Sequence, residues 1–361
     1  MKDLELMVTL WPTFPHFRRF ATDARLSGIR LNSAMVKGDV ISNELEIAKK
    51  IPGAVPLYFD LKGRQLRVRE VHSYKDHLEL VLNHPIKVQT PTMVLFKAGA
   101  DYALLKKVTK KGRRLIFEGG PQYMVYEGES LHIRHPSYEM QGPIFLDYEI
   151  EKIEKARKLG FDKFFLSYVE DQRDIDEFRE YVGDSHIIAK IESKRGLEYV
   201  ANQYKKHPNL SLMAARGDLY VEVDKPHHIL EAMKLIIKKD PEAYLGSRLL
   251  LTTIRSPVPE CSDLSELAWL YDIGYRRMML CDEICLKEEL LARAVNVFEG
   301  FRQSYAHDKV EMTSADYKVE DKKYQEKDQE IKTEAGDKKP EPLVKTYSRI
   351  ELDIPIISAG N

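Results

Sequence analysis

The feature of this sequence that most limits its fold is a short apolar run, rich in β-branched residues, that recurs eight times. Most of these runs are followed by a segment with helical periodicity, and this alternation is typical of a parallel sheet wrapped by helices. Eight such strands close a barrel, so the sequence predicts an α/β fold, a (β/α)8 barrel. The predicted strands are Leu4–Thr9, Gly28–Asn32, Val55–Asp60, Lys163–Tyr168, Ile187–Glu192, Leu210–Ala214, Arg248–Thr252 and Arg277–Leu280.

The helices between the strands are clearest at two places. In Asp147–Leu159, apolar residues repeat at three-residue steps before Gly160 ends the run. Asp174–Tyr181 shows a similar pattern. Both segments therefore predict helices that cover the barrel.

Residues 70–137 interrupt this alternation between the third and fourth strands. His77–Leu82 and Leu115–Phe117 read as strands, the second preceded by a Lys110–Arg113 turn, which predicts an all-β insert on a barrel loop. The basic turn is interpreted as an exposed hairpin tip with solvated charge, and contact with a phosphate is the alternative. The barrel then comprises residues 1–69 and 138–303.

The composition changes abruptly after the last predicted helix. Residues 304–342 are dominated by lysine, glutamate and aspartate, which predicts a disordered charged linker. Residues 343–361 recover apolar character, enough for a short strand or docking segment on the barrel or on a partner.

The charge balance bears on the class of partner. The 56 lysines and arginines nearly cancel the 57 aspartates and glutamates, so no global field favours nucleic acid or a membrane surface, and a small molecule is the expected partner. Without an apolar signal core after Met1, or a long apolar run elsewhere, the chain is expected in the cytoplasm. The three cysteines are too few for a disulfide framework, and a zinc site at Cys281 and Cys285 is the less favoured interpretation of their spacing.

Polar residues gather at the carboxyl ends of the predicted strands, where the chemistry of such barrels takes place. They are Arg30, Asn32, Asp60, Ser167, Lys190, Glu192, Asp218, Thr252 and Thr253.

Lys190-Ile191-Glu192 is informative because alternate residues of a strand point the same way. The ammonium and the carboxylate therefore both face the barrel mouth, while the isoleucine faces the helices. Glu192 and Asp218 could share a hard divalent cation such as Mg²⁺. A structural salt bridge among Lys190, Glu192 and Asp218 explains the spacing equally well.

Several motifs, in order along the chain, resemble those of the pyruvate kinase family. The Lys190-Ile191-Glu192 segment and the segment Met213–Leu219 resemble the family's KIE and VARGDLGVE motifs, with fitting spacing between them. The further matches are Thr9–Pro12, Arg30–Asn32, Asp60–Arg67, Leu166–Val169 and Met279–Glu283. The resemblance covers residues 9 to about 290 and implies a barrel of pyruvate kinase type with the insert as its lid.

The resemblance also implies roles for individual residues. Glu192 and Asp218 match the ligands of Mg²⁺ or Mn²⁺, and Lys190 matches the lysine that offsets phosphoryl charge. Arg30 matches the arginine that grips the phosphoryl group. The remaining matches are Arg67 and Asn32 near the nucleotide, Asn32 and Asp60 at a potassium site, Gly217 and Asp218 at the substrate carboxylate, and Thr253, with a one-residue ambiguity, beside the enolate.

The departures from the family pattern concern parts of this site. Ala34, Leu61 and Gln65 stand where the family has serine, threonine and glutamate, so the potassium site is degraded and K⁺ dependence is not expected. Tyr220 replaces a glycine and is expected to crowd the substrate loop or change its turn. The lysine-rich tail has no counterpart of the family's regulatory domain, so regulation by sugar phosphates is not expected.

Three functions remain open at this point. The first is a pyruvate kinase-like enzyme that converts phosphoenolpyruvate and ADP to pyruvate and ATP with Mg²⁺, with a homo-oligomer among its expected assemblies. The second is a metal-dependent lyase or decarboxylase acting on a pyruvate enolate without a nucleotide. The third is a catalytically weakened sensor or scaffold.

Overall fold

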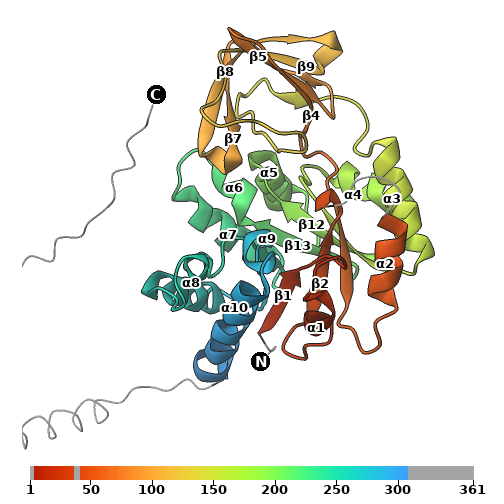
Figure 1. The fold of residues 1–361 in the computed structure, drawn as a ribbon, viewed down its shortest axis with the longest axis vertical. Helices are drawn as coiled ribbons and strands as arrows, with labels where there is room; N and C mark the ends of the chain where they lie inside the picture. The colour runs from red at the N-terminus through yellow and green to blue at the C-terminus, as the bar shows by residue number, and fades with distance from the viewer. Residues whose placement is uncertain (1–3, 36–40, 308–361) are drawn as a thin grey trace, which may run out of the picture. The chain divides into compact units, whose positions relative to one another are not determined.

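The computed structural model describes residues 4–35 and 41–307. Eight parallel strands close a barrel, as the sequence predicted, and their order is β1-β15-β14-β13-β12-β11-β3-β2. Figure 1 shows this barrel below the insert. The barrel strands are β1 (Glu5–Thr9), β2 (Gly28–Asn32), β3 (Leu57–Leu61), β11 (Lys163–Leu166), β12 (His186–Ile191), β13 (Leu210–Ala215), β14 (Tyr244–Gly246) and β15 (Arg277–Met279).

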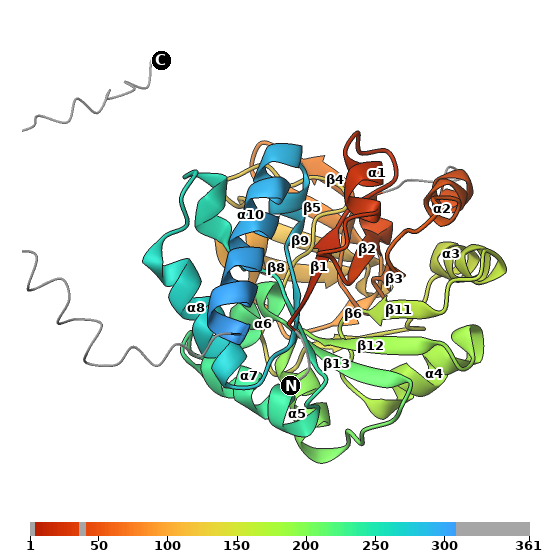
Figure 2. The same cartoon turned by 90° about the horizontal axis from the view of Figure 1, so that it is seen from below.

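Helices surround the barrel strands when the barrel is viewed from below (Figure 2). The barrel interior is filled by bulky side chains such as Tyr58, Phe165 and Met213, and a larger apolar core lies between the strands and the helices. The helices are α1 (Phe17–Ala21), α2 (Ile41–Lys49), α3 (Asp147–Lys158), α4 (Gln172–Val182), α5 (Lys194–Asn202), α6 (Arg216–Glu222), α7 (His228–Lys239), α8 (Cys261–Asp272), α9 (Asp282–Cys285) and α10 (Glu288–Phe301).

The predicted seventh strand was wrong in its position. The strand is β14 (Tyr244–Gly246), whereas Arg248 and Leu250 have φ values of 61° and 53°. A 3₁₀ helix, η5 (Leu251–Ile254), follows them. The apolar run that suggested a strand is buried, with Leu249 and Leu250 at 0% exposure, but it is buried in a turn. An apolar run records burial and does not by itself distinguish a strand from a turn.

The insert follows β3 and forms its own five-stranded antiparallel sheet, in the order β4-β5-β9-β8-β7. A second, two-stranded sheet joins β6 and β10, and the predicted basic turn is the short 3₁₀ segment between β8 and β9. The strands are β4 (Val68–Ser73), β5 (His77–Leu82), β6 (Ile86–Lys87), β7 (Thr92–Phe96), β8 (Asp101–Thr109), β9 (Arg114–Glu118) and β10 (Glu139–Met140).

Residues 302–307 form a last helical segment, η6 (Arg302–His307). The rest of the predicted charged linker and the predicted segment 343–361 lie outside the described residues. Within the described ranges, the structure contains no helix long and apolar enough to cross a membrane.

His84, between β5 and β6, makes the stability of the protein depend on pH. It is fully buried, its Nε2 donates a 3.1 Å hydrogen bond to the Gly63 carbonyl, and its Nδ1 has no partner. Burial and the charges of Arg113 and Arg64 lower the pKa of His84 to about 4. The unfolded chain therefore binds a proton at higher pH than the folded chain, and stability is lost as the pH falls from about 6.5 to 4.

We expect His84 to account for a loss of up to about 3 kcal/mol in the free energy of unfolding across this pH window. Urea unfolding at several pH values would measure it, and His84→Gln is expected to flatten the pH dependence. His72→Gln, at a histidine whose side chain is 36% exposed, serves as the control and should keep the wild-type slope. Equal slopes for wild type and His84→Gln would contradict the expectation.

Candidate active site

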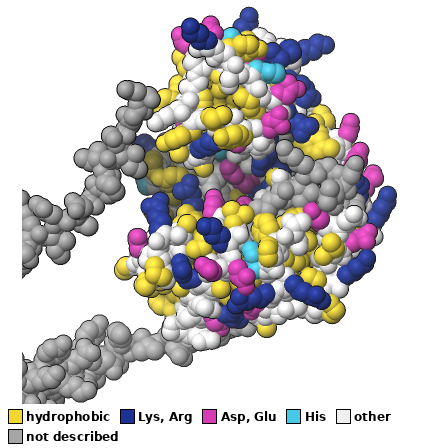
Figure 3. Space-filling model, in the orientation of Figure 1, with side chains coloured by type: hydrophobic (Ala, Val, Ile, Leu, Met, Phe, Trp, Pro, Cys, Tyr) yellow, Lys and Arg dark blue, Asp and Glu magenta, His cyan; other side chains and the backbone are white. Residues whose placement is uncertain are grey.

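A cavity of about 290 Å³ lies where the carboxyl ends of the barrel strands face the insert. Figure 3 shows this face of the molecule hollowed between the insert and the barrel. Most of the predicted site residues line the cavity: Arg30, Asn32, Arg67, Lys190, Glu192, Gly217 and Asp218. The structure therefore brings together residues that are up to 188 positions apart in the chain, counting from Arg30 to Asp218.

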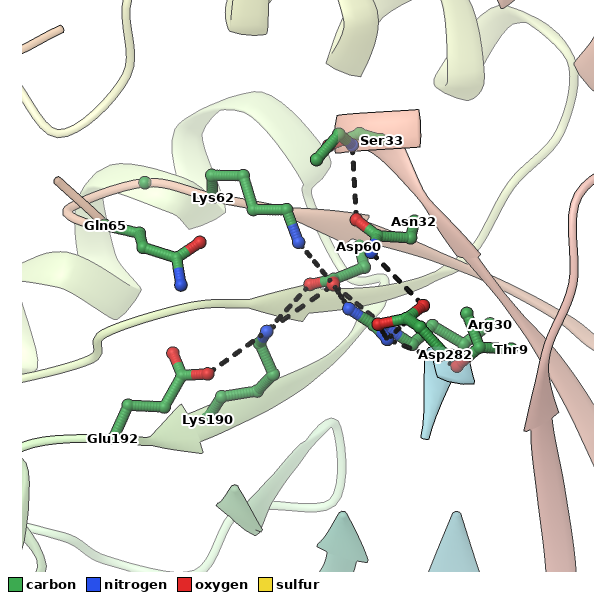
Figure 4. A network of polar contacts seen from close by, with 12 residues as sticks. Thr9, Arg30, Asn32, Ser33, Asp60, Lys62, Gln65, Lys190, Glu192 and Asp282 are labelled. Carbon is green, nitrogen blue, oxygen red and sulfur yellow. Dashed lines mark hydrogen bonds and ion pairs between the residues drawn. The ribbon is translucent and has the colours of Figure 1, made fainter. Parts of the chain in front are cut away.

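Asp60 is the centre of the charge network beneath the cavity (Figure 4). Its fully buried carboxylate accepts hydrogen bonds from Arg30, at 2.9 Å from Nε and 2.5 Å from Nη2. The ammonium groups of Lys62 and Lys190 lie 3.0 and 3.3 Å from its oxygens. Although burial opposes ionisation, these three cations hold the pKa of Asp60 well below its usual range. The carboxylate thus gathers three positive groups at one point of the barrel mouth.

Lys62 was not predicted from the sequence, although it stands two residues after Asp60. Its side chain is buried in the cavity wall. Burial and the neighbouring cations Lys190 and Arg30 lower the pKa of Lys62 to about 7, against the attraction of Asp60. The motif of residues 60–67 could have indicated this lysine, because residues 60 and 62 of an extended segment point the same way.

Asp282 was likewise not predicted from the sequence as a site residue. It follows the eighth strand, and its carboxylate lies 3.3 Å from Arg30 Nη1 and 3.4 Å from Asn32 Nδ2. Although burial opposes ionisation, Arg30 and Lys62 lower the pKa of Asp282. Its place just beyond a barrel strand was the available signal.

Glu192 and Asp218 form the acidic side of the cavity. Glu192 is 2% exposed, its Oε1 lies 3.4 Å from Lys190 Nζ, and its Oε2 accepts a 2.7 Å hydrogen bond from the Tyr168 backbone. Burial, together with repulsion from Asp218, raises the pKa of Glu192 to about 7. Although burial raises the pKa of Asp218, the neighbouring imidazole of His132 lowers it to about 2. One carboxyl group is thus ionised more readily than the other.

His132 holds Asp218 from the insert side. Its Nε2 lies 3.4 Å from Asp218 Oδ1, and its Nδ1 lies 2.7 Å from Glu222 Oε1 and 3.1 Å from the Tyr168 hydroxyl. Burial opposes protonation, but Asp218 and Glu222 raise the pKa of His132 to about 9. No motif in the sequence indicated this contact, because it joins the insert to a helix 86 residues later, from His132 to Asp218.

Comparison with known proteins points to one family. Residues 128–268 match the family model of the pyruvate kinase barrel domain. The pyruvate kinase of Methanocaldococcus jannaschii is 25% identical over 302 residues, which cover 78% of this chain and 65% of the relative. The pyruvate kinase of Thermoplasma acidophilum is 26% identical over 336 residues, covering 87% of this chain and 60% of the relative. The chain is thus similar to pyruvate kinases over most of its length, at low identity.

The match to these relatives is partial in length. This chain spans 65% and 60% of the two archaeal pyruvate kinases. A pyruvate kinase of Agrobacterium vitis is 32% identical, but only over 140 residues, which are 37% of this chain. The similarity to pyruvate kinases therefore supports a barrel of the same type.

The donors present fit the divalent cation that the pyruvate kinase family implies. Glu192 and Asp218 are carboxylates that line the same cavity, and burial makes the charge on Glu192 unfavourable until a cation compensates it. Among the described residues, no group of three or more histidine, cysteine, aspartate or glutamate side chains forms a metal cluster. Two carboxylates suit Mg²⁺, which keeps its remaining positions for water and substrate oxygens.

The monovalent-cation site of the pyruvate kinase family does not fit this chain. Asp60 already contacts three positive side chains, and Ala34 and Leu61 offer no side-chain oxygen. Asn32 Oδ1 accepts a 3.2 Å hydrogen bond from the Ala34 backbone. A further cation at this carboxylate would meet repulsion from the resident ones.

If the chain forms pyruvate from phosphoenolpyruvate and ADP, as the resemblance implies, we expect the same rate in potassium chloride and in tetramethylammonium chloride at equal ionic strength. The rate of pyruvate formation with Mg²⁺ present would measure this, and removal of Mg²⁺ serves as the control, because it should stop the reaction in either salt. Strong stimulation by K⁺ would show that Asn32 and Asp60 still bind it.

Thr253 does not reach the cavity, contrary to its predicted role. It is 0% exposed and its hydroxyl donates a 2.5 Å hydrogen bond to the Leu250 carbonyl within the η5 turn. The hydroxyl at the carboxyl end of β14 belongs to Ser247, which lines the cavity. A Cβ on Gly217 would lie 3.0 Å from Ser247 Oγ, so the glycine lets this hydroxyl approach closely. The error follows from the misplaced seventh strand.

Tyr220 does not crowd the cavity. Residues 216–222 are helical, and Tyr220 points outward with 40% exposure beneath the guanidinium of Arg248, 4.9 Å from the ring centroid. The tyrosine that stands in place of the family's glycine therefore does not narrow the cavity.

Arg67 connects the site to a second cavity, of about 530 Å³. Its guanidinium donates hydrogen bonds of 3.1 and 2.6 Å to Gln65 Oε1, and Gln65 in turn lies 3.4 Å from Asp218. The second cavity is also lined by Lys62, Arg69, Tyr148, Lys152 and Lys155. Arg69 and Lys152 lie 5.1 and 5.5 Å from the Tyr148 ring centroid, so aromatic and basic groups adjoin the phosphoryl end of the site.

Proposed function

We propose that this chain transfers a phosphoryl group between phosphoenolpyruvate and ADP with Mg²⁺, yielding pyruvate and ATP. The observation that carries the proposal is the meeting of Arg30, Lys62 and Lys190 with the carboxyl pair of Glu192 and Asp218 in one cavity. Phosphoryl transfer is mainly positioning and neutralisation of oxygens by cations, and this cavity offers both kinds of group.

The chain's own residues would position the phosphoryl group. The phosphoryl oxygens would take Arg30, Lys62 and Lys190 as partners, in competition with the Asp60 carboxylate. An oxygen of the ADP β-phosphate then bonds to phosphorus while the bond from phosphorus to the enol oxygen breaks. Glu192 and Asp218 would hold Mg²⁺, which when bound neutralises oxygens of the substrate and of the transferred group.

The enolate left by the transfer must accept a proton at its methylene carbon to become pyruvate. Ser247 lies beside Gly217 at the cavity wall, so we assign to Ser247 the place at the enolate that the sequence assigned to Thr253. The cavity beside Tyr148 would take the nucleotide, with Arg67 between its phosphates and the transferred group. A lyase acting on the enolate alone would have no use for this second cavity.

The test is an assay of the purified full chain with phosphoenolpyruvate, ADP and Mg²⁺. We expect pyruvate and ATP in equal amounts and none of either with EDTA. Pyruvate without ATP would overturn the kinase assignment in favour of hydrolysis. The absence of turnover, together with Mg²⁺-dependent binding of oxalate, would overturn it in favour of a sensor that keeps the enolate site.

A further inference from the structure

His132 belongs to the insert by its backbone, yet its side chain reaches the barrel. His132 and Leu95 of β7 exchange both backbone hydrogen bonds, at 2.9 and 3.0 Å. The imidazole is 1% exposed and lies 3.4 Å from the carboxylate of Asp218. The insert therefore contacts a proposed metal ligand through a buried side chain.

The imidazole is fixed on more than one side. Its other nitrogen lies 2.7 Å from Glu222, which stands one helical turn after Asp218 on α6, and 3.1 Å from the Tyr168 hydroxyl. The ring thus bridges two carboxylates of a single helix face, and its orientation is set by the groups around it. Groups that contact a metal ligand in this way orient it and tune metal affinity.

We infer that His132 is a positioning residue for Asp218, holding this carboxylate in place for the divalent cation and thereby coupling the insert to metal binding. The inference rests on the proposed function, because it takes Asp218 as a ligand of that cation. A purely structural ion pair would instead contribute to stability and leave metal affinity unchanged.

The test uses two substitutions that separate the two contacts of the ring. The amide nitrogen of His132→Asn stands near the place of Nδ1, so it keeps Glu222 and cannot reach Asp218. The amide nitrogen of His132→Gln extends toward the place of Nε2, and so toward Asp218. We expect Mn²⁺ binding to the full chain, measured by the electron paramagnetic resonance signal of free Mn²⁺, to weaken about 10–100-fold in His132→Asn and to recover largely in His132→Gln.

Arg134→Ala is the matched control. Arg134 also ties the insert to the end of α6, through hydrogen bonds of 2.9 and 3.4 Å to the carbonyls of Val223 and Asp224, but these bonds do not involve Asp218. We expect this variant to bind Mn²⁺ as the wild type does.

Hydrogen exchange gives a readout of the coupling that does not depend on activity. Mn²⁺ is expected to slow exchange at the backbone amides of Leu95 and His132 in the wild type and to leave it unchanged in His132→Asn. Wild-type affinity in His132→Asn, or equal weakening in Arg134→Ala, would overturn the inference while leaving the proposed function standing. A wild-type chain that does not bind Mn²⁺ would overturn both.

Discussion

Lys190→Met is expected to lower kcat for phosphoryl transfer by about 10²–10³-fold, the usual effect of removing one preorganised group that stabilises developing charge. The Lys190 ammonium lies in the cavity wall, 3.3 Å from Asp60 and 3.4 Å from Glu192. Methionine has a similar length and no charge, so it removes the cation with little change in packing. The rate of pyruvate formation at saturating substrates and Mg²⁺ measures the effect.

The fold is expected to survive this change, because Asp60 keeps Arg30 and Lys62 as partners. Lys163→Met is the control, since Lys163 starts β11 at the opposite mouth of the barrel and pairs there with the exposed Asp162. Its kcat should equal that of the wild type. A Lys190→Met enzyme with more than half of the wild-type kcat would leave Lys190 as a structural ion-pair partner, the alternative that the sequence left open.

Much of the barrel could be predicted from the sequence, because buried parallel strands carry apolar runs and the intervening helices carry a three- to four-residue period. Seven of the eight predicted strands overlap the observed ones at nearly the same bounds. The exception was β14, a strand of three residues that ends in Gly246. The place of β14 in the barrel depends on close tertiary packing at Gly246, since a Cβ on this glycine would lie 2.0 Å from Met213 Cε.

The site was predictable where the sequence motif and the strand geometry agreed. Lys190 and Glu192 line the cavity, while Ile191 is buried in the core between strands and helices, as the alternation of a strand requires. Contacts made across the fold left weaker marks. Asp282 was marked only by its place just beyond the eighth strand, and His132 reaches the site only because the insert returns to the barrel there.

The structure also bears on the two interpretations of Lys190, Glu192 and Asp218. The sequence offered a choice between a metal site and a salt bridge at Lys190, Glu192 and Asp218, and the structure contains elements of each. Lys190 pairs with Asp60 as well as with Glu192, while Asp218 pairs with His132. Glu192 and Asp218 thus line one cavity and repel each other, and a cation bound between them would relieve this repulsion.

Asp60→Asn is expected to lower the free energy of unfolding by about 3–5 kcal/mol at pH 7, because it leaves three buried cations without their shared carboxylate. The amide has nearly the same shape as the carboxylate, so the loss reflects charge and not a cavity. Arg30 and the two lysines together hold the pKa of Asp60 well below its usual range. Urea unfolding of both proteins at pH 7 measures the difference.

The pH dependence of that difference distinguishes charge from packing. Because the pKa of Asp60 is depressed by folding, its contribution is present above the pKa of the unfolded chain and is lost as the pH falls through the folded value. The gap between wild type and Asp60→Asn should therefore narrow below about pH 4. Asp162→Asn removes a carboxylate whose side chain is 70% exposed and should change stability by less than about 0.5 kcal/mol. If Asp60→Asn also changed the free energy of unfolding by less than about 0.5 kcal/mol, the three cations would not depend on Asp60. A phosphoryl group entering the cavity would then meet little competition from the Asp60 carboxylate for these cations.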